Sequence, residues 1–212
     1  MEKKGKTAVS LALNAAVVVL VSVGVAIAAG TLGWGIVEYY TVDSNLFLLA
    51  AAAVSAAAAA VSLAGGRPIP AWVVKLKYYA VCTVSLTFLV VITVLGPLLG
   101  GWKSLVWMLF QESGLFLHLL APVTGALSFW LADAPAPRDR LAPVKAMAFT
   151  GLYAAALILL NFLRVVEGPY PFLKVYEQPW WMSGIWFVVI LGMAAALAWV
   201  VWRIKRGWRT GP

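Results

Sequence analysis

The sequence has little charge and few of the residues that build common metal and redox sites. Only 11% of its 212 residues are charged, whereas soluble domains carry about 25%. It contains one cysteine, Cys82, and one histidine, His118. An intrachain disulfide is therefore excluded, and a zinc or haem site made from these two residue types is not expected. We predict no metal and no cofactor.

Hydrophobic residues make up 63% of the chain and fall into long runs. About 20 helical residues cross a hydrocarbon layer of about 30 Å. We therefore predict an all-α integral membrane protein, with six transmembrane helices in one bundle that forms a single domain over residues 1–212. The first run follows a basic start, as in a secretory signal, but it is longer than a signal core and is interpreted as a retained helix. The expected spans are residues 7–30, 41–65, 78–98, 113–132, 142–163 and 180–202.

The net charge of +8 is distributed as membrane topology requires. Lysine and arginine concentrate at both termini and in the second–third and fourth–fifth connections. The other connections hold only Lys103, Arg164 and Lys174. By the positive-inside rule both termini are cytoplasmic. No basic-aromatic module is present, so a nucleic-acid partner is not expected.

The single histidine lies in the fourth span, Ser113–Ala132. An ionisable group at membrane depth costs free energy, which makes it a functional-site hypothesis. Imidazole can also gain or lose a proton near neutral pH. Pro122 leaves the carbonyl of His118 without its usual helical donor, which predicts a widened or kinked helix beside the histidine.

A second polar group, Thr41 with Asp43, Ser44 and Asn45, opens the second span. Thr41, Ser44 and Asn45 stand at i, i+3 and i+4, so they share one helix face. Thr41 lies about 4.5 Å, Asn45 about 10 Å and His118 about 9 Å along their spans from the outer side. The two polar places are therefore predicted to overlap in depth.

The fifth span brings Asn161 and Arg164 to the same outer end. Each polar side chain also has a structural interpretation. Asn45 and Asn161 could form interhelical hydrogen bonds. Asp43 and Glu38 could be solvated acids at a helix start, and Arg164 a snorkelling residue at a helix end.

Three patches carry a family resemblance: Tyr40-Thr41-Val42-Asp43-Ser44-Asn45-Leu46, His118 followed by Leu-Leu-Ala-Pro122, and Gly168-Pro169-Tyr170-Pro171-Phe172-Leu173. They resemble the bacterial relatives of the androgen-induced six-transmembrane threonine hydrolases. Animal members of that family cleave fatty acid esters of hydroxy fatty acids. The resemblance implies that Thr41 is the nucleophile and His118 its partner. It also implies a bacterial inner (plasma) membrane, and the distribution of lysine and arginine predicts that the active site lies toward the outer side of that membrane. The Ser44-Asn45 ending differs from the animal pattern, which bears on the substrate.

The expected function is therefore intramembrane hydrolysis of a lipid ester, with a membrane lipid or fatty acyl ester as the substrate. An imidazole can take the threonine proton as attack proceeds. The candidates for the oxyanion or orienting roles are Asn45, Asn161, Ser44, Asp43 and Glu38, and those for binding a substrate carboxylate are Arg164 and Lys103.

The alternative is a small membrane transporter or lipid-binding protein. Its polar pathway would be lined by His118, Asn45 and Asn161, because intramembrane histidines also serve as proton relays.

Overall fold

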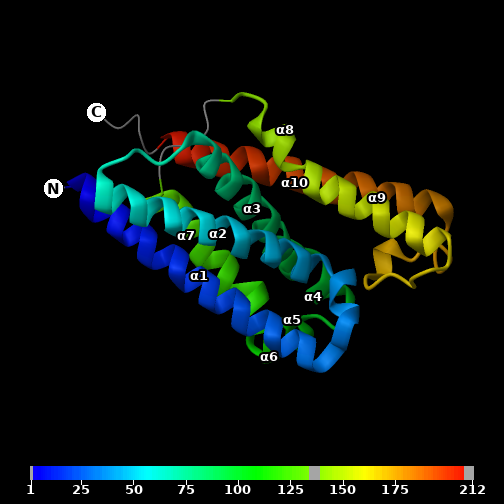
Figure 1. Cartoon of the computed structure of the whole chain (residues 1–212). Coiled ribbons are helices and arrows are strands. Elements are labelled where there is room, and N and C mark those ends of the chain that lie inside the picture. Colours follow the sequence, from blue (N-terminus) through cyan, green and yellow to red (C-terminus); the bar gives the residue numbers. More distant parts are fainter. Residues whose placement is uncertain (1, 134–138, 208–212) are drawn as a thin grey trace.

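A computed structural model describes residues 2–133 and 139–207, and in these residues six helices are long and apolar enough to cross a membrane. No strand occurs in the described residues. The start of α1 and the end of α10 lie at the same end of the bundle (Figure 1). The predicted all-α, six-helix architecture is confirmed. Expectations for residues 134–138 and 208–212, including part of two basic segments, lie outside the described residues.

The six spans consist of regular α-helices together with short segments of wider π-helix or tighter 3-10 helix. In chain order they are α1 (Glu2–Leu32); α2 (Tyr40–Gly65), preceded by the 3-10 turn η1 (Gly33–Glu38); α3 (Ala71–Val90) with η2 (Val91–Leu95) and α4 (Gly96–Leu98); α6 (Glu112–Gly114) with η3 (Leu115–Leu120), α7 (Ala121–Leu127) and η4 (Ser128–Ala132); α8 (Ala142–Ala146) with α9 (Ala148–Phe162); and α10 (Trp180–Gly207).

Three of these spans extend clearly beyond the expected ranges. The first helix begins at Glu2 rather than at residue 7, because its basic first turn is already helical. The third span begins at Ala71 rather than at Tyr78, because Pro70 provides an extended N-cap and the less apolar first turns are already helical. The last span continues past Trp202 to Gly207, since Lys205 in its final turns is buried rather than solvated. Hydropathy alone places these limits too close to the membrane centre.

Two prolines account for two π-helical segments. In η3 the N–H of Ala121 donates to the carbonyl of Phe116, five residues back, immediately before Pro122. The segment η2 stands in the same relation to Pro97. Proline has no N–H and its ring clashes with the carbonyl four residues back, so the preceding turn widens. The predicted widening beside His118 is therefore confirmed.

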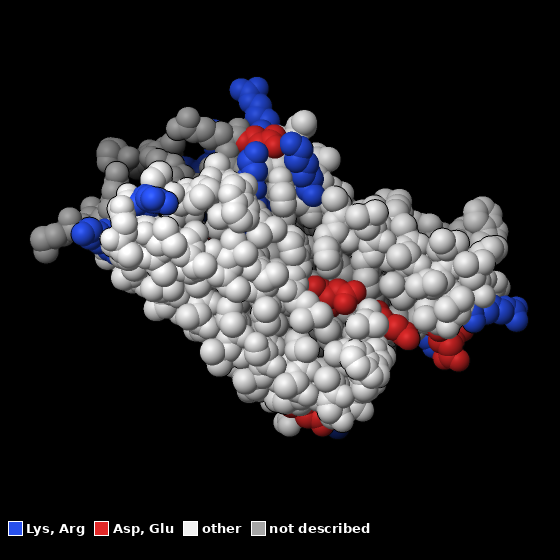
Figure 2. All heavy atoms as spheres, viewed as in Figure 1, with Lys and Arg blue, Asp and Glu red and all other residues white. Residues whose placement is uncertain are grey.

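The bundle has two parts. In the larger part, α1 and α2 pack side by side along their length, and small residues of α2 such as Ala51 and Ala52 are fully buried. Small side chains let helix backbones approach closely within a membrane. In the smaller part, α9 and α10 form a hairpin that extends away from α1 and α2 (Figure 1). Figure 2 shows the surface hollowed where this hairpin meets the larger part, and a broad uncharged face over the helices.

Buried polar side chains join the helices at the end where α1 begins. The Nζ of Lys77 donates to Asn14 Oδ1 (2.6 Å), and Asn14 Nδ2 donates to Asp133 Oδ1 (3.0 Å). Ser10 Oγ donates to the same carboxylate oxygen (2.5 Å). We call Ser10, Asn14, Lys77 and Asp133 the Lys77 cluster. It links α1, α3 and the end of the fourth span, and Lys205 of α10 adds a hydrogen bond to the Asp133 carbonyl (3.0 Å).

Candidate active site

Thr41 lies in the first turn of α2, which begins after an extended Tyr39. The first N–H groups of a helix have no partner within the helix. Here the N–H of Tyr40 donates to Tyr153 Oη (3.0 Å), and the N–H of Thr41 donates to Tyr170 Oη (3.4 Å). Tyr153 belongs to α9, and Tyr170 belongs to the connection that follows it. The α9–α10 hairpin therefore fixes the start of α2.

The hydroxyl of Thr41 meets the imidazole of His118. Thr41 Oγ1 is 3.2 Å from His118 Nε2, and His118 Nδ1 is 2.9 Å from the carbonyl oxygen of Met108. A carbonyl can only accept a hydrogen bond, so Nδ1 carries the hydrogen of the neutral ring. Nε2 then presents its lone pair, and the Thr41 hydroxyl donates to it. This network assigns the tautomer that a general base for Thr41 needs.

The Met108 carbonyl can approach the histidine because Gly114 has no side chain. A Cβ at Gly114 would lie 2.1 Å from Met108 O. Met108 stands near the end of a short helix, α5 (Trp102–Phe110), that packs against η3. The imidazole is thus held at Nδ1 by a backbone carbonyl and not by the carboxylate of Asp43 or Glu38 that we considered from the sequence.

Asn45 joins the two helices that carry the pair. Its Nδ2 donates to the carbonyls of Thr41 (2.7 Å) and Leu117 (3.0 Å). In a π-helix the carbonyl of each residue accepts from the N–H five residues later. For Leu117 that residue is Pro122, which has no N–H. The Asn45 amide supplies the missing donor, and its hydrogens are used in fixing Thr41 against His118. In this arrangement Asn45 positions the pair and is not free to donate to an oxyanion.

Ser44 points toward α3. Its Oγ donates to the Thr41 carbonyl (3.2 Å) and lies 2.9 Å from Thr87 Oγ1. Ser44 is fully buried, whereas Asp43, two residues from Thr41, lies on another face of the helix and is half-buried. Ser44 therefore supports the backbone of Thr41 rather than taking part in the pair.

Asn161 holds the connection after α9. Its Nδ2 donates to the carbonyls of Val166 (3.1 Å) and Glu167 (2.6 Å), and its Oδ1 accepts from the N–H of Val175 (2.8 Å). All of these partners flank Tyr170 in the sequence. Asn161 therefore shapes the connection that delivers Tyr170 to Thr41, and its amide is not directed at the Thr41–His118 pair.

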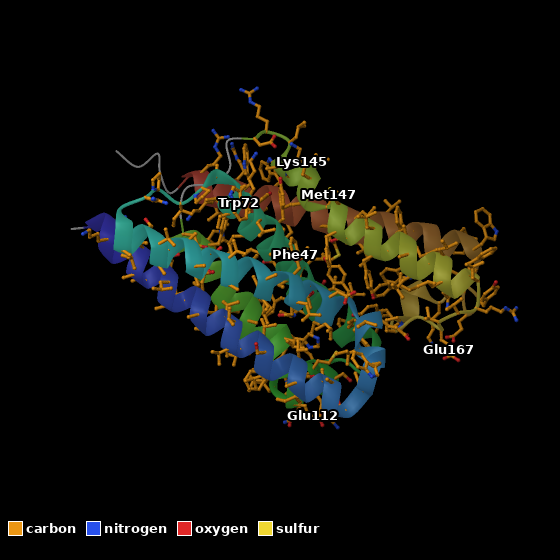
Figure 3. All side chains as sticks on the ribbon, viewed as in Figure 1. Phe47, Trp72, Glu112, Lys145, Met147 and Glu167 are labelled. Carbon is orange, nitrogen blue, oxygen red and sulfur yellow. The ribbon has the colours of Figure 1, made fainter. Side chains whose placement is uncertain are left out.

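The two candidate carboxylate-binding residues are at the surface. Arg164 is exposed and stacks over the ring of Tyr176, with its Cζ 4.8 Å from the ring centroid. It lines a surface pocket with Asn161 and Glu167 that is separate from the one lined by Thr41. Lys103 is exposed on α5. Figure 3 shows Glu167 on the connection at the tip of the α9–α10 hairpin and Glu112 at the start of the fourth span, with Lys145 far from both.

Tyr170 is the site residue to which the sequence patterns gave no role. Its ring stacks on Phe172 (centroids 5.2 Å apart) and meets Tyr39 edge-on (6.2 Å). Burial raises the pKa of Tyr170 to about 12, partly offset by hydrogen bonding to the side chain and N–H of Thr41. The phenol therefore remains protonated near neutral pH, beside the Thr41 hydroxyl. Only the patch around Tyr170 in the family resemblance drew attention to this segment.

Thr41 also lines an apolar pocket between α2, α3, α9 and α10. Thr41, Thr87 and Tyr170 are among its few polar residues. His118 does not line this pocket, so Thr41 is the member of the pair that belongs to its wall. Apolar residues that line the pocket include Leu86, Val90, Leu95, Ile158, Phe172, Trp186 and Ile190.

Within the described residues, no group of three or more His, Cys, Asp or Glu side chains is placed to hold a metal ion. Comparisons with models of known families, with curated proteins and with solved structures find no match for the chain. The geometry of the site is therefore the main basis for assigning a function.

Proposed function

We propose that the chain is an intramembrane hydrolase that cleaves an acyl ester of a lipid, with Thr41 as the nucleophile and His118 as the general base. The observation that carries the proposal is the hydrogen bond between Thr41 Oγ1 and the unprotonated Nε2 of His118, with Thr41 on the wall of an apolar pocket. A hydroxyl is a weak nucleophile until a base takes its proton, and this pairing supplies that base.

The reaction proceeds in two halves. As Thr41 Oγ1 attacks the ester carbonyl carbon, its proton passes to His118 Nε2, and the carbonyl oxygen becomes an oxyanion. The intermediate collapses when the carbon–oxygen bond to the alcohol breaks, and His118 returns the proton to the leaving alcohol. The acyl group is now esterified to Thr41. Water then attacks the acyl carbon and loses a proton to His118. As the bond from the acyl carbon to Thr41 Oγ1 breaks, His118 returns that proton to Oγ1, which frees the fatty acid and restores Thr41.

The substrate class rests on the pocket and on the family resemblance. Apolar walls favour an acyl chain, and the resemblance suggests a fatty acid ester of a hydroxy fatty acid. The basic segments orient the start of α1 toward the cytoplasm of a bacterial inner membrane. With that orientation Thr41 and His118 lie toward the outer side, where water for the second half-reaction can enter.

The proposal is tested by hydrolysis of a fluorogenic long-chain fatty acyl ester by purified protein in detergent. We expect wild-type protein to release the fluorescent alcohol, and Thr41→Ala to release none above background. Thr93→Ala is the matched control, because Thr93 lies in the third span and its hydroxyl bonds to the carbonyl one turn back. Equal rates for Thr41→Ala and wild type would disprove the assignment. An inert wild type that transports a lipid across vesicles would favour the carrier instead.

A further inference from the structure

Tyr170 brings a second hydroxyl to Thr41. Its Oη is 3.4 Å from the Thr41 nitrogen. Both residues line the same pocket, and Tyr170 is only 9% exposed. We infer that Tyr170 is a third catalytic residue, whose hydroxyl donates a hydrogen bond to the oxyanion formed when Thr41 attacks an ester. This inference rests on the proposed hydrolase function.

The hydrogen-bond inventory leaves the Tyr170 hydrogen available for this role. A phenol has one hydrogen to donate and can also accept. Tyr170 accepts from the Thr41 N–H, and the Thr41 hydroxyl gives its own hydrogen to His118. The hydrogen of the Tyr170 hydroxyl is used in neither bond. In the tetrahedral intermediate, Thr41 Oγ1 and the oxyanion are bonded to the same carbon, so a donor held against Thr41 needs to shift little to reach the oxyanion.

The amide donors that the sequence suggested are engaged elsewhere. Asn45 donates to the Thr41 and Leu117 carbonyls, and Asn161 donates within the connection after α9. The Tyr170 ring is held by its stack on Phe172 and by the connection that Asn161 fixes. A donor held in place before the reaction needs no reorganisation as charge develops, which is what makes an oxyanion donor effective.

The test compares Tyr170→Phe with Tyr176→Phe. The first change removes the hydroxyl beside Thr41 and keeps the stacked ring. The second removes a hydroxyl of the same connection that donates to the Phe162 carbonyl (2.7 Å) and does not line the pocket beside Thr41. For Tyr170→Phe we expect kcat to fall about 100- to 1,000-fold with KM changed less than about threefold. Tyr176→Phe should stay within about threefold of wild type in both constants.

Two inhibitors separate oxyanion binding from simple displacement of Thr41. A long-chain trifluoromethyl ketone forms a tetrahedral adduct with an oxyanion, whereas the ether analogue of the substrate forms none. We expect Tyr170→Phe to weaken the ketone by the same factor as kcat/KM and to leave the ether unchanged. Equal weakening of both inhibitors, or full activity in Tyr170→Phe, would overturn the inference while the hydrolase proposal stands. A folded wild type that neither hydrolyses esters nor binds the ketone would overturn both.

Discussion

The Lys77 cluster and the Thr41–His118 site lie at opposite ends of the bundle, and both bury side chains that can carry charge. In the Lys77 cluster the polar side chains bond to one another: Lys77 to Asn14, and Asn14 and Ser10 to Asp133. The void beside it is about 10 Å³, roughly the room of one water molecule. The Lys77 cluster is therefore suited to holding helices together.

At the other end, the Thr41 hydroxyl lies between a base and a pocket. His118 bonds to a backbone carbonyl at Nδ1 and to the Thr41 hydroxyl at Nε2. The neighbouring pocket is apolar and has a volume of about 50 Å³. Comparison of the two places suggests that a network of polar side chains bonded to one another holds helices together, whereas a hydroxyl bonded to an imidazole beside an apolar pocket is suited to chemistry. Variants in the two places should therefore affect different properties.

The largest effect is expected for His118→Gln. Glutamine retains a polar side chain but cannot take the threonine proton. Turnover of the long-chain ester should fall about a million-fold, as when the histidine base of a nucleophile–histidine pair is lost. The melting temperature in detergent should change little. Turnover within about tenfold of wild type would disprove the role of His118 as the base.

Lys77→Met should affect stability instead of chemistry. The change removes the ammonium group and leaves the buried Asn14 amide oxygen without its donor, which costs about 1–3 kcal/mol. Thermal unfolding followed by circular dichroism should show a clear fall, while kcat of the folded fraction stays near wild type.

A further variant sharpens this prediction. Lys75→Met, on the same helix but partly exposed, should melt close to wild type. A Lys77→Met variant that melts like Lys75→Met would show that the cluster does not stabilise the fold.

A smaller effect on catalysis is expected for Gly114→Ala. The added methyl group would overlap the Met108 carbonyl and move it away from His118 Nδ1. A misplacement of about 1 Å at a catalytic group can cost about 100-fold in rate, so kcat should fall by up to that factor. Gly151→Ala is the control, since a Cβ there meets no atom within 4 Å. Full activity in Gly114→Ala would contradict the positioning role of the Met108 carbonyl.

The smallest effect is expected for Ser44→Ala. This change removes one hydrogen bond to the Thr41 carbonyl, which keeps its bond from Asn45. Thr87 keeps its bond to the Thr83 carbonyl (3.4 Å). One lost hydrogen bond of about 1 kcal/mol predicts at most about a tenfold fall in kcat. If Ser44→Ala were as damaging as Thr41→Ala, the nucleophile would have to be reassigned to Ser44.

The sequence predicts what depends on helix length and helix periodicity. Six apolar runs specify six spans because the thickness of the membrane fixes how many residues a span needs. Helix geometry predicts only that Thr41 and His118 lie at equal depth along two spans, whereas the family resemblance implies that they act as a pair. The hydrogen bond between them supplies the contact.

What the sequence could not predict depends on contacts between distant segments. Met108 acts through its backbone carbonyl, which every residue has, so no side-chain pattern marks it. Tyr170 lies in an irregular connection without helical periodicity. Lys77 was counted among interfacial charges, yet it is buried against Asn14, 63 residues away. Each of these contacts is fixed by packing between helices.

The role of Thr41 as a nucleophile activated by His118 is tested most directly by mass spectrometry of the intact protein after incubation with a long-chain fluorophosphonate, followed by peptide mapping. We predict one adduct per chain on Thr41, formed in wild type and lost in both Thr41→Ala and His118→Gln. Absence of an adduct in folded wild-type protein, or an adduct on Thr41 that forms equally fast without His118, would contradict it.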